Sequence, residues 1–204
     1  MRLKIWCFVL VAVFLLVGCG TRKYVEVQSL ETRLPYEEAI SLPGNVVKNG
    51  IALAAHALNK KECIDYFSYD LNADGYLPVK IVLTNNSALR LLVHGADAAL
   101  TDGKQTFSHV PSSEIIAELQ DHISVPFFNV SKEEYYNEGA IRKNAIFVNY
   151  NQKGLGYRIL EPGQSVSGIV CFKREKLPQG DFSVSLNVQD LGRVRYLTLK
   201  AGVL

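Results

Sequence analysis

The chain has 204 residues, of which 48% are hydrophobic and 21% charged. This composition excludes a disordered or low-complexity protein and allows one domain of ordinary size or two small ones. The formal net charge is only +2, so the basic excess that accompanies nucleic-acid binding is missing and no nucleic-acid partner is expected.

The N-terminus has the pattern of a secretory signal peptide. Arg2 and Lys4 precede an unbroken apolar run of 13 residues, Ile5–Val17. A helix that spans a bilayer needs about 20 apolar residues. A shorter run behind basic residues indicates a signal peptide, and we expect residues 1–18 to be removed.

The run ends in Leu16-Val17-Gly18-Cys19, which resembles the lipobox of bacterial lipoproteins. The resemblance implies cleavage before Cys19 and attachment of acyl chains (palmitate among them) to this cysteine. Three buried acyl chains would hold the protein on a bilayer without a spanning helix. The alternatives are an ordinary signal peptide with a chance cysteine and a hydrophobic helix of a cytosolic domain.

The lipobox resemblance also implies a location in the cell envelope. Asp directly after the lipidated cysteine would favour the inner membrane of a Gram-negative bacterium, and this chain has Gly20. We therefore expect the outer membrane in a cell with two membranes. The 22 basic side chains include Arg2 and Lys4, so the processed chain has 20 basic and 20 acidic side chains, and charge steering of a partner is not expected.

Beside the expected lipidation site Cys19, two cysteines remain in the processed chain, Cys63 and Cys171. An oxidising compartment permits a disulfide between them, and the closed loop of about 100 residues would stabilise the fold by about 4.7 kcal/mol. The alternative is two separate buried thiols, because Cys171 lies in an apolar run. The sequence leaves both open.

Residues 19–44 have the composition of a tether, on which Tyr36, Ile40 and Leu42 are candidates for docking onto the domain. The domain itself is expected over residues 45–204. Residues 51–58 are predicted as a strand. Asn59 followed by Glu62 forms a capping-box pattern that predicts a short helix through Phe67.

Short strands are predicted along the rest of the chain, separated by turn residues. Asp102-Gly103 is a hairpin signal. The predicted strands cover residues 78–84, 89–94, 145–150, 166–172, 182–188 and 193–199.

Residues 111–144 interrupt this β pattern and are predicted as a helical insertion. Apolar residues recur at helical spacing behind Ser112, and Ser131 with Glu134 is a second capping-box pattern. Long connections often carry function. We therefore expect the insertion to carry the function and the strands to carry the stability, provided that Ile115, Ile116 and Leu119 do not complete the main core.

The fold class that follows is mainly β, an antiparallel sandwich with a short helix before the main strands and a helical insertion. Four segments in this order, Pro78–Ser87, Leu100–Gly103, Leu160–Ser165 and Gly168–Phe172, are similar to secreted bacterial immunoglobulin-like domains, the telokin-like type above all. The resemblance implies an immunoglobulin-like sandwich and an interaction module, and it supplies no catalytic residues.

Patterns of catalytic or metal-binding residues are weak. Asp70-Leu71-Asn72-Ala73-Asp74-Gly75 matches the first half of a calcium loop, but the twelfth position is Ile81 instead of Glu, so a turn into the next strand is expected. The histidines, at positions 56, 94, 109 and 122, lack metal-ligand spacing. We expect no enzyme, no cofactor and no metal site.

Tyrosines cluster in the helical insertion and just after it: Tyr135, Tyr136, Tyr150 and Tyr157. Tyrosine is enriched at interfaces, so these four residues are the predicted binding face, with packing onto the sandwich as the alternative. The expected function is a lipid-anchored, non-catalytic interaction or structural accessory module with an envelope protein as partner. The alternative is a lipoprotein that binds a small molecule or glycan, which a pocket lined by these tyrosines would favour over a flat surface.

Overall fold

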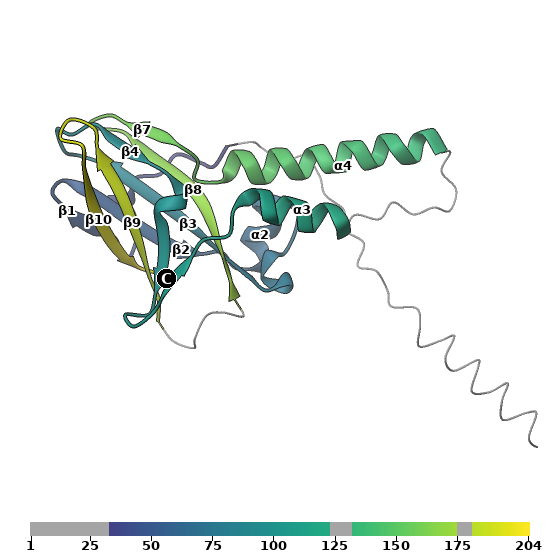
Figure 1. Ribbon diagram of the computed structural model, residues 1–204, viewed down its shortest axis with the longest axis horizontal. Helices are drawn as coiled ribbons and strands as arrows, with labels where there is room; N and C mark the ends of the chain where they lie inside the picture. The colour runs from purple at the N-terminus through teal and green to yellow at the C-terminus, as the bar shows by residue number, and fades with distance from the viewer. Residues whose placement is uncertain (1–32, 123–131, 175–180) are drawn as a thin grey trace, which may run out of the picture.

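The computed structural model describes residues 33–122, 132–174 and 181–204, without the side chains of residues 120–122, 132–139, 141 and 142. Within this part the protein is mainly β, with two antiparallel sheets and helices gathered at one end (Figure 1). The predicted mainly β sandwich is confirmed, whereas the immunoglobulin-like arrangement in particular stays a prediction. None of the described helices is both long and apolar enough to cross a membrane.

The first sheet has four strands in the order β1 (Val46–Lys48), β2 (Ile51–Ala57), β3 (Tyr76–Asn85) and β8 (Ser165–Lys173). β3 is buried along its whole length, because both of its faces are covered. Its odd-numbered residues from Leu77 to Leu83 pack into the space between the sheets. Its other face meets the N-terminal segment and the helices.

The second sheet is organised around β9, which pairs with β4 and β5 on one side and with β10 on the other. The predicted Asp102-Gly103 hairpin is confirmed as the β5–β6 turn. Val184, Leu186 and Val188 alternate with polar residues and are fully buried. The strands of this sheet are β4 (Leu91–Val93), β5 (Ala98–Thr101), β6 (Thr106–Ser108), β7 (Arg158–Leu160), β9 (Ser183–Asp190) and β10 (Arg195–Gly202).

The short helix α2 (Lys60–Phe67) confirms the capping-box prediction. Glu62 N donates to Asn59 Oδ1 at 3.1 Å, and Asn59 N donates to Glu62 Oε2 at 2.8 Å. The helix presents Cys63 and Phe67 to the interior. The 3-10 turn η2 (Leu71–Asp74) then leads into β3.

The helical segment is longer than the sequence predicted. α3 (Ser112–His122) and α4 (Lys132–Lys153) lie side by side, and α4 extends well beyond the sheets (Figure 1). The predicted strand 145–150 is wrong, because these residues form the last turns of α4. Ala145, Ile146, Asn149 and Tyr150 are buried, at intervals that place them on one helix face.

The helices build a second core cluster beside the one between the sheets. Among the described residues, the main cluster contains residues of both sheets and, from the helical region, Leu155 after the end of α4. The second cluster joins α2, α3 and α4 to Ile169 and Cys171 of β8. Ile115, Ile116 and Leu119 are buried in it, so the helical segment contributes to the stability of the fold.

Part of the predicted tether belongs to the domain. Ala39, in the 3-10 turn η1 (Ala39–Ser41), is fully buried against Ala52, Ala54 and Val82. Ala39 N donates to Thr84 Oγ1 at 2.8 Å. The domain therefore begins before residue 45. Of the docking candidates, Leu42 packs on this cluster, whereas Tyr36 and Ile40 are exposed.

Candidate functional site

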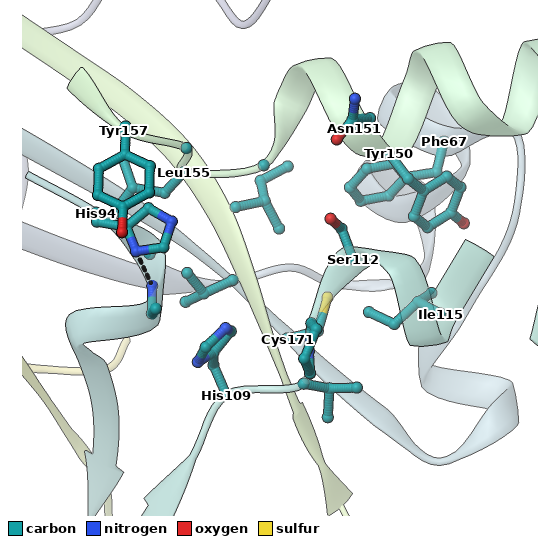
Figure 2. Close-up of a pocket in the computed structure, with 18 residues that line it drawn as sticks. Phe67, His94, His109, Ser112, Ile115, Tyr150, Asn151, Leu155, Tyr157 and Cys171 are labelled. Carbon is teal, nitrogen blue, oxygen red and sulfur yellow. Dashed lines mark hydrogen bonds between the residues drawn. The ribbon is translucent and has the colours of Figure 1, made fainter. Parts of the chain in front are cut away.

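A cavity of about 430 Å³ lies where the sandwich meets the helical segment (Figure 2). Five parts of the chain form its walls. They are Phe67 of α2, His94 with Gly95 and Ala96 of the turn η3 (Gly95–Asp97), the stretch from His109 into α3, the end of α4 with residues 154–157, and residues 169–171 of β8. We call this cavity the histidine cleft, because His94 and His109 both line it.

His94 and Tyr157 form a stacked pair at the cleft. Their ring centroids are 3.7 Å apart and the ring planes differ by 10°. Ala96 N donates to His94 Nδ1 at 3.3 Å, which fixes the imidazole and leaves the second ring nitrogen pointing toward the middle of the cleft (Figure 2). Tyr157 is 67% exposed, so the pair presents an aromatic ring at the solvent side of the cleft.

His109 lies on another wall and is half-buried. Burial lowers the pKa of His109 below the ordinary histidine value of 6.5. Positive charge on His94 lowers the pKa of His109 further, whereas Asp97 acts in the opposite direction. His109 is therefore held in its uncharged form at neutral pH.

Two histidines, a serine and an asparagine supply polar side chains to the cleft. Ser112 and Asn151 line it together with the two histidines, and none of the described lining residues is Asp, Glu, Lys or Arg. A ligand would meet hydrogen-bonding groups and aromatic rings, without a countercharge for an ion.

Tyr150 lies deeper than Tyr157, at the inner end of the cleft. Its ring stacks on Phe67 with centroids 4.3 Å apart, and only 4% of the residue is exposed. Its hydroxyl is, among the described residues, the one buried side-chain polar atom without a hydrogen-bond partner. Burial raises the pKa of the Tyr150 hydroxyl, and the neighbouring Cys171 and Cys63 contribute in the same direction.

The two cysteines are free, buried thiols of the same core cluster, so the disulfide alternative is not formed in this structure. Burial raises the pKa of Cys63 to about 11, with the charge of Asp70 as the next cause. Burial, together with Cys63, also raises the pKa of Cys171. Cys171 lines the cleft, but its protonated thiol is a poor nucleophile.

Of the predicted binding face, the structure brings Tyr150 and Tyr157 to one cavity. Tyr135 and Tyr136 belong to α4, and their side chains lie outside the described residues. Cys19 and the whole lipobox also lie outside them. The two tyrosines that the structure places together therefore line one cavity, with Tyr150 buried and Tyr157 exposed.

Sequence reasoning missed His94, His109, Ser112 and Asn151 as site residues. A usable signal was the Asp102-Gly103 hairpin. Its register pairs Ala99 with Ser108, so His109, the next residue after β6, leaves the hairpin at the end where η3 precedes β5. The hairpin therefore brings two histidines together that are far apart in the sequence.

The calcium-loop fragment has a structural role. Asp70 Oδ1 accepts from Asn72 N at 3.2 Å, and Asp74 accepts from the Tyr69 hydroxyl. Ile81, at the position of the missing Glu, is fully buried between the sheets. The segment is a turn that leads into β3, as predicted.

A second cavity of about 270 Å³ lies on the outer face of the first sheet, and its charged groups are paired. Lys80 Nζ is 2.7 Å from the Glu37 carboxylate, and His56 Nε2 is 2.9 Å from Glu62 Oε1. Burial acts to raise the pKa of Glu62, but hydrogen bonds from Asn59 and His56 outweigh it and the pKa is lowered. These pairs hold the N-terminal segment and α2 in place.

No protein-family model and no curated protein matches the chain. Among solved structures, the chain is similar to the yjhA protein from Bacillus subtilis, with 11% sequence identity and a TM-score of 0.36 over 72% of this chain and 78% of that one. It is also similar to a functionally unknown protein from Listeria monocytogenes EGD-e, with 10% identity and a TM-score of 0.32 over 78% of this chain and 79% of that one.

Proposed function

We propose that this protein is a lipid-anchored, non-catalytic binding module of the cell envelope and that the histidine cleft is its recognition site. The observation that carries the proposal is the cleft itself. A cavity of about 430 Å³ lies in the range of small-ligand sites, about 300 to 1,000 Å³, and such sites combine apolar walls with a few placed polar groups. This favours a small-ligand module over a flat protein-binding face.

The chemistry of the cleft supports a non-catalytic role. None of its described lining residues is a carboxylate, so the cleft itself offers no acid to orient a histidine as the Asp of a Ser-His-Asp triad does. Cys171 has a raised pKa, which disfavours the thiolate that a nucleophilic mechanism needs.

The anchor is tested at Cys19. The wild-type protein should incorporate a labelled fatty acid and lose residues 1–18, whereas Cys19→Ser should remain an unlabelled, unprocessed precursor. Cys7→Ser is the matched control, because Cys7 lies within the signal peptide, and it should be labelled like the wild type. Equal labelling of Cys19→Ser would disprove the anchor.

The recognition site is tested by photocrosslinking in intact cells. A photoreactive phenylalanine at position 157 should form an adduct with an envelope component. The same residue at position 196 is the control, because Tyr196 is 64% exposed on β10, away from the cleft. Adducts that are absent at position 157, or equal at both positions, would contradict a recognition role for the cleft.

A protein partner on α4 is the second candidate, and Phe147 favours it. This residue is 50% exposed on the part of α4 that packs on the domain, and an exposed aromatic side chain is a common interface anchor. An adduct from position 147, without one from position 157, would favour this candidate.

A further inference from the structure

We propose that the histidine cleft binds an uncharged sugar ring, with one face of the sugar packed on the ring of Tyr157. This inference rests on the proposed function and specifies its ligand class. It follows from three properties of the cleft. They are the absence of Asp, Glu, Lys and Arg from its described lining, its supported aromatic surface and the kind of polar groups around it.

The lack of charge disfavours ionic ligands. A carboxylate or phosphate that enters the cleft loses hydration and needs a cationic side chain in return. The described lining has no Lys or Arg, and His109 is held uncharged by burial. Some charged residues lie near the cleft without lining it. Asp97 acts electrostatically on His109, Arg158 donates to the backbone oxygen of Tyr157 at 2.9 Å, and Glu114 and Lys173 line an adjoining cavity. A neutral ligand loses the least on entry.

Tyr157 provides the aromatic surface. One face of its ring is covered by His94 at 3.7 Å, yet the residue is 67% exposed, so a ligand can reach the remaining surface. The hydrogen bond from Ala96 N holds His94, and His94 in turn supports the tyrosine ring. The negatively polarised face of an aromatic ring attracts C–H groups, and a sugar ring presents such groups on one face.

The polar groups distinguish a sugar from a flat aromatic ligand. His94, His109, Ser112 and Asn151 line the same cavity and together offer both donors and acceptors. Hydroxyl groups also donate and accept, so several sugar hydroxyls can be matched at once. A flat aromatic compound would leave most of these groups without a partner, which costs binding free energy.

Histidine NMR tests the proposal directly. The full lipidated protein, with ¹³C-labelled histidine and held in detergent micelles, is titrated with neutral cello-, malto- and chito-oligosaccharides. Matched additions are a sialylated and a uronic-acid oligosaccharide, and indole as a flat aromatic compound. A neutral oligosaccharide should shift the signals of His94 and His109. The His56 signal should stay in place, since His56 pairs with Glu62 on the far cavity.

Variants at exposed tyrosines test the stacking. Tyr157→Ala should weaken sugar binding about tenfold, which corresponds to about 1.4 kcal/mol, while Tyr157→Phe should bind like the wild type. Tyr196→Ala is the matched control, because Tyr196 is similarly exposed at 64%, and it should leave the affinity unchanged. An unchanged affinity in Tyr157→Ala would overturn the proposal.

The remaining outcomes separate this inference from the proposed function. If only the charged oligosaccharides or indole shift His94 and His109, the cleft is a recognition site but the neutral-sugar inference is overturned. If no compound shifts them, the inference is also overturned, and the crosslink from position 157 decides the proposed function independently.

Discussion

At the scale of single residues, His109 couples the charge of the cleft to the stability of the fold. Its pKa in the folded protein lies below 6.5 because of burial and of charge on His94, with Asp97 opposing. The unfolded chain therefore binds more protons than the folded one just below pH 6.5. The contribution of His109 to stability is present above pH 6.5 and decreases as the pH falls.

We expect the thermal midpoint of the wild type to fall between pH 7.5 and pH 5.5, and His109→Gln to reduce this fall. His56→Gln should keep it, since His56 is an exposed residue on another face. Thermal melting followed by circular dichroism at several pH values checks this. If the thermal midpoints of the wild type and of His109→Gln change with pH by the same amount, the expected effect of the burial of His109 is refuted.

The cysteines allow a second prediction at this scale. Cys63 and Cys171 are free and buried, with raised pKa values. A maleimide should therefore leave both unmodified in the folded protein and modify both after denaturation without a reductant. Mass spectrometry counts the added labels. A requirement for reduction before labelling would instead establish the disulfide.

For single residues, the sequence predicts the chemical character of a side chain better than its place in the fold. The raised pKa values of the cysteines agree with the apolar run around Cys171. The proximity of His94 and His109 was not apparent, because it depends on hairpin register and on the packing of η3 against residues after α4. Tyr150 and Tyr157 were both predicted as site residues, but only burial separates the deep ring from the exposed one.

At the scale of elements, the connection after α4 (residues 154–157) packs closely against two glycines, Gly95 and Gly168. Leu155 N donates to Ile169 O at 3.2 Å, and Gly95 N donates to Leu155 O at 2.7 Å. A Cβ on Gly168 would lie 2.5 Å from Leu155 Cα, closer than packed atoms allow. Gly168 therefore permits the close approach that places Tyr157 beside His94.

Gly168→Ala should lower the free energy of unfolding by about 1–3 kcal/mol, the usual cost of overpacking. It should also shift the NMR signal of His94, since Tyr157 follows the displaced segment. Gly202→Ala is the control, because a Cβ there meets no atom within 4 Å, and it should be close to neutral. Urea denaturation measures both variants, and equal midpoints would show that the connection is not tightly packed.

Elements with local signals were predicted correctly. The capping box of Asn59 and Glu62 and the hairpin at Asp102-Gly103 depend on contacts within a few residues. The segment 145–150 was predicted incorrectly, because a short apolar run fits a strand and a buried helix face equally. Its helical state follows from packing against Phe67 and α3, which lie far away in the sequence.

At the scale of the whole molecule, an ion pair at a nearly buried lysine is among the contacts that attach the N-terminal segment to the first sheet. The Lys80 side chain is 8% exposed and that of Glu37 29% exposed. Glu37→Gln would leave the lysine charge without its carboxylate, so it should destabilise the fold by about 1–3 kcal/mol, between the values of exposed and buried pairs.

Glu38→Gln is the control for this variant, because Glu38 is an exposed neighbour and should change stability by less than about 0.5 kcal/mol. Urea denaturation compares the two. Equal effects would show that the segment contributes little through this pair.

The overall architecture could be predicted from the sequence, but the arrangement of its two cores could not. Alternating strands such as β9 indicate a sandwich. The second core cluster forms only when α2, α3, α4 and β8 pack together. No pattern of neighbouring residues in the sequence indicates this packing. The histidine cleft lies at this junction, so the sequence indicates its tyrosines but not the residues that line the cavity beside them.

The docked N-terminal segment also determines how the domain would respond to mechanical load. Among the described contacts, a pull from a lipid at Cys19 would reach the packing of Leu34 on the second core cluster first, then the Glu37–Lys80 pair and the hydrogen bond from Ala39 to Thr84, and only afterwards the strands. These contacts would break one at a time, since they lie in series along the chain. In single-molecule pulling we expect a small, low-force extension before the sheets unfold. The docked N-terminal segment would detach in this step and lengthen the chain while the sheets stay folded.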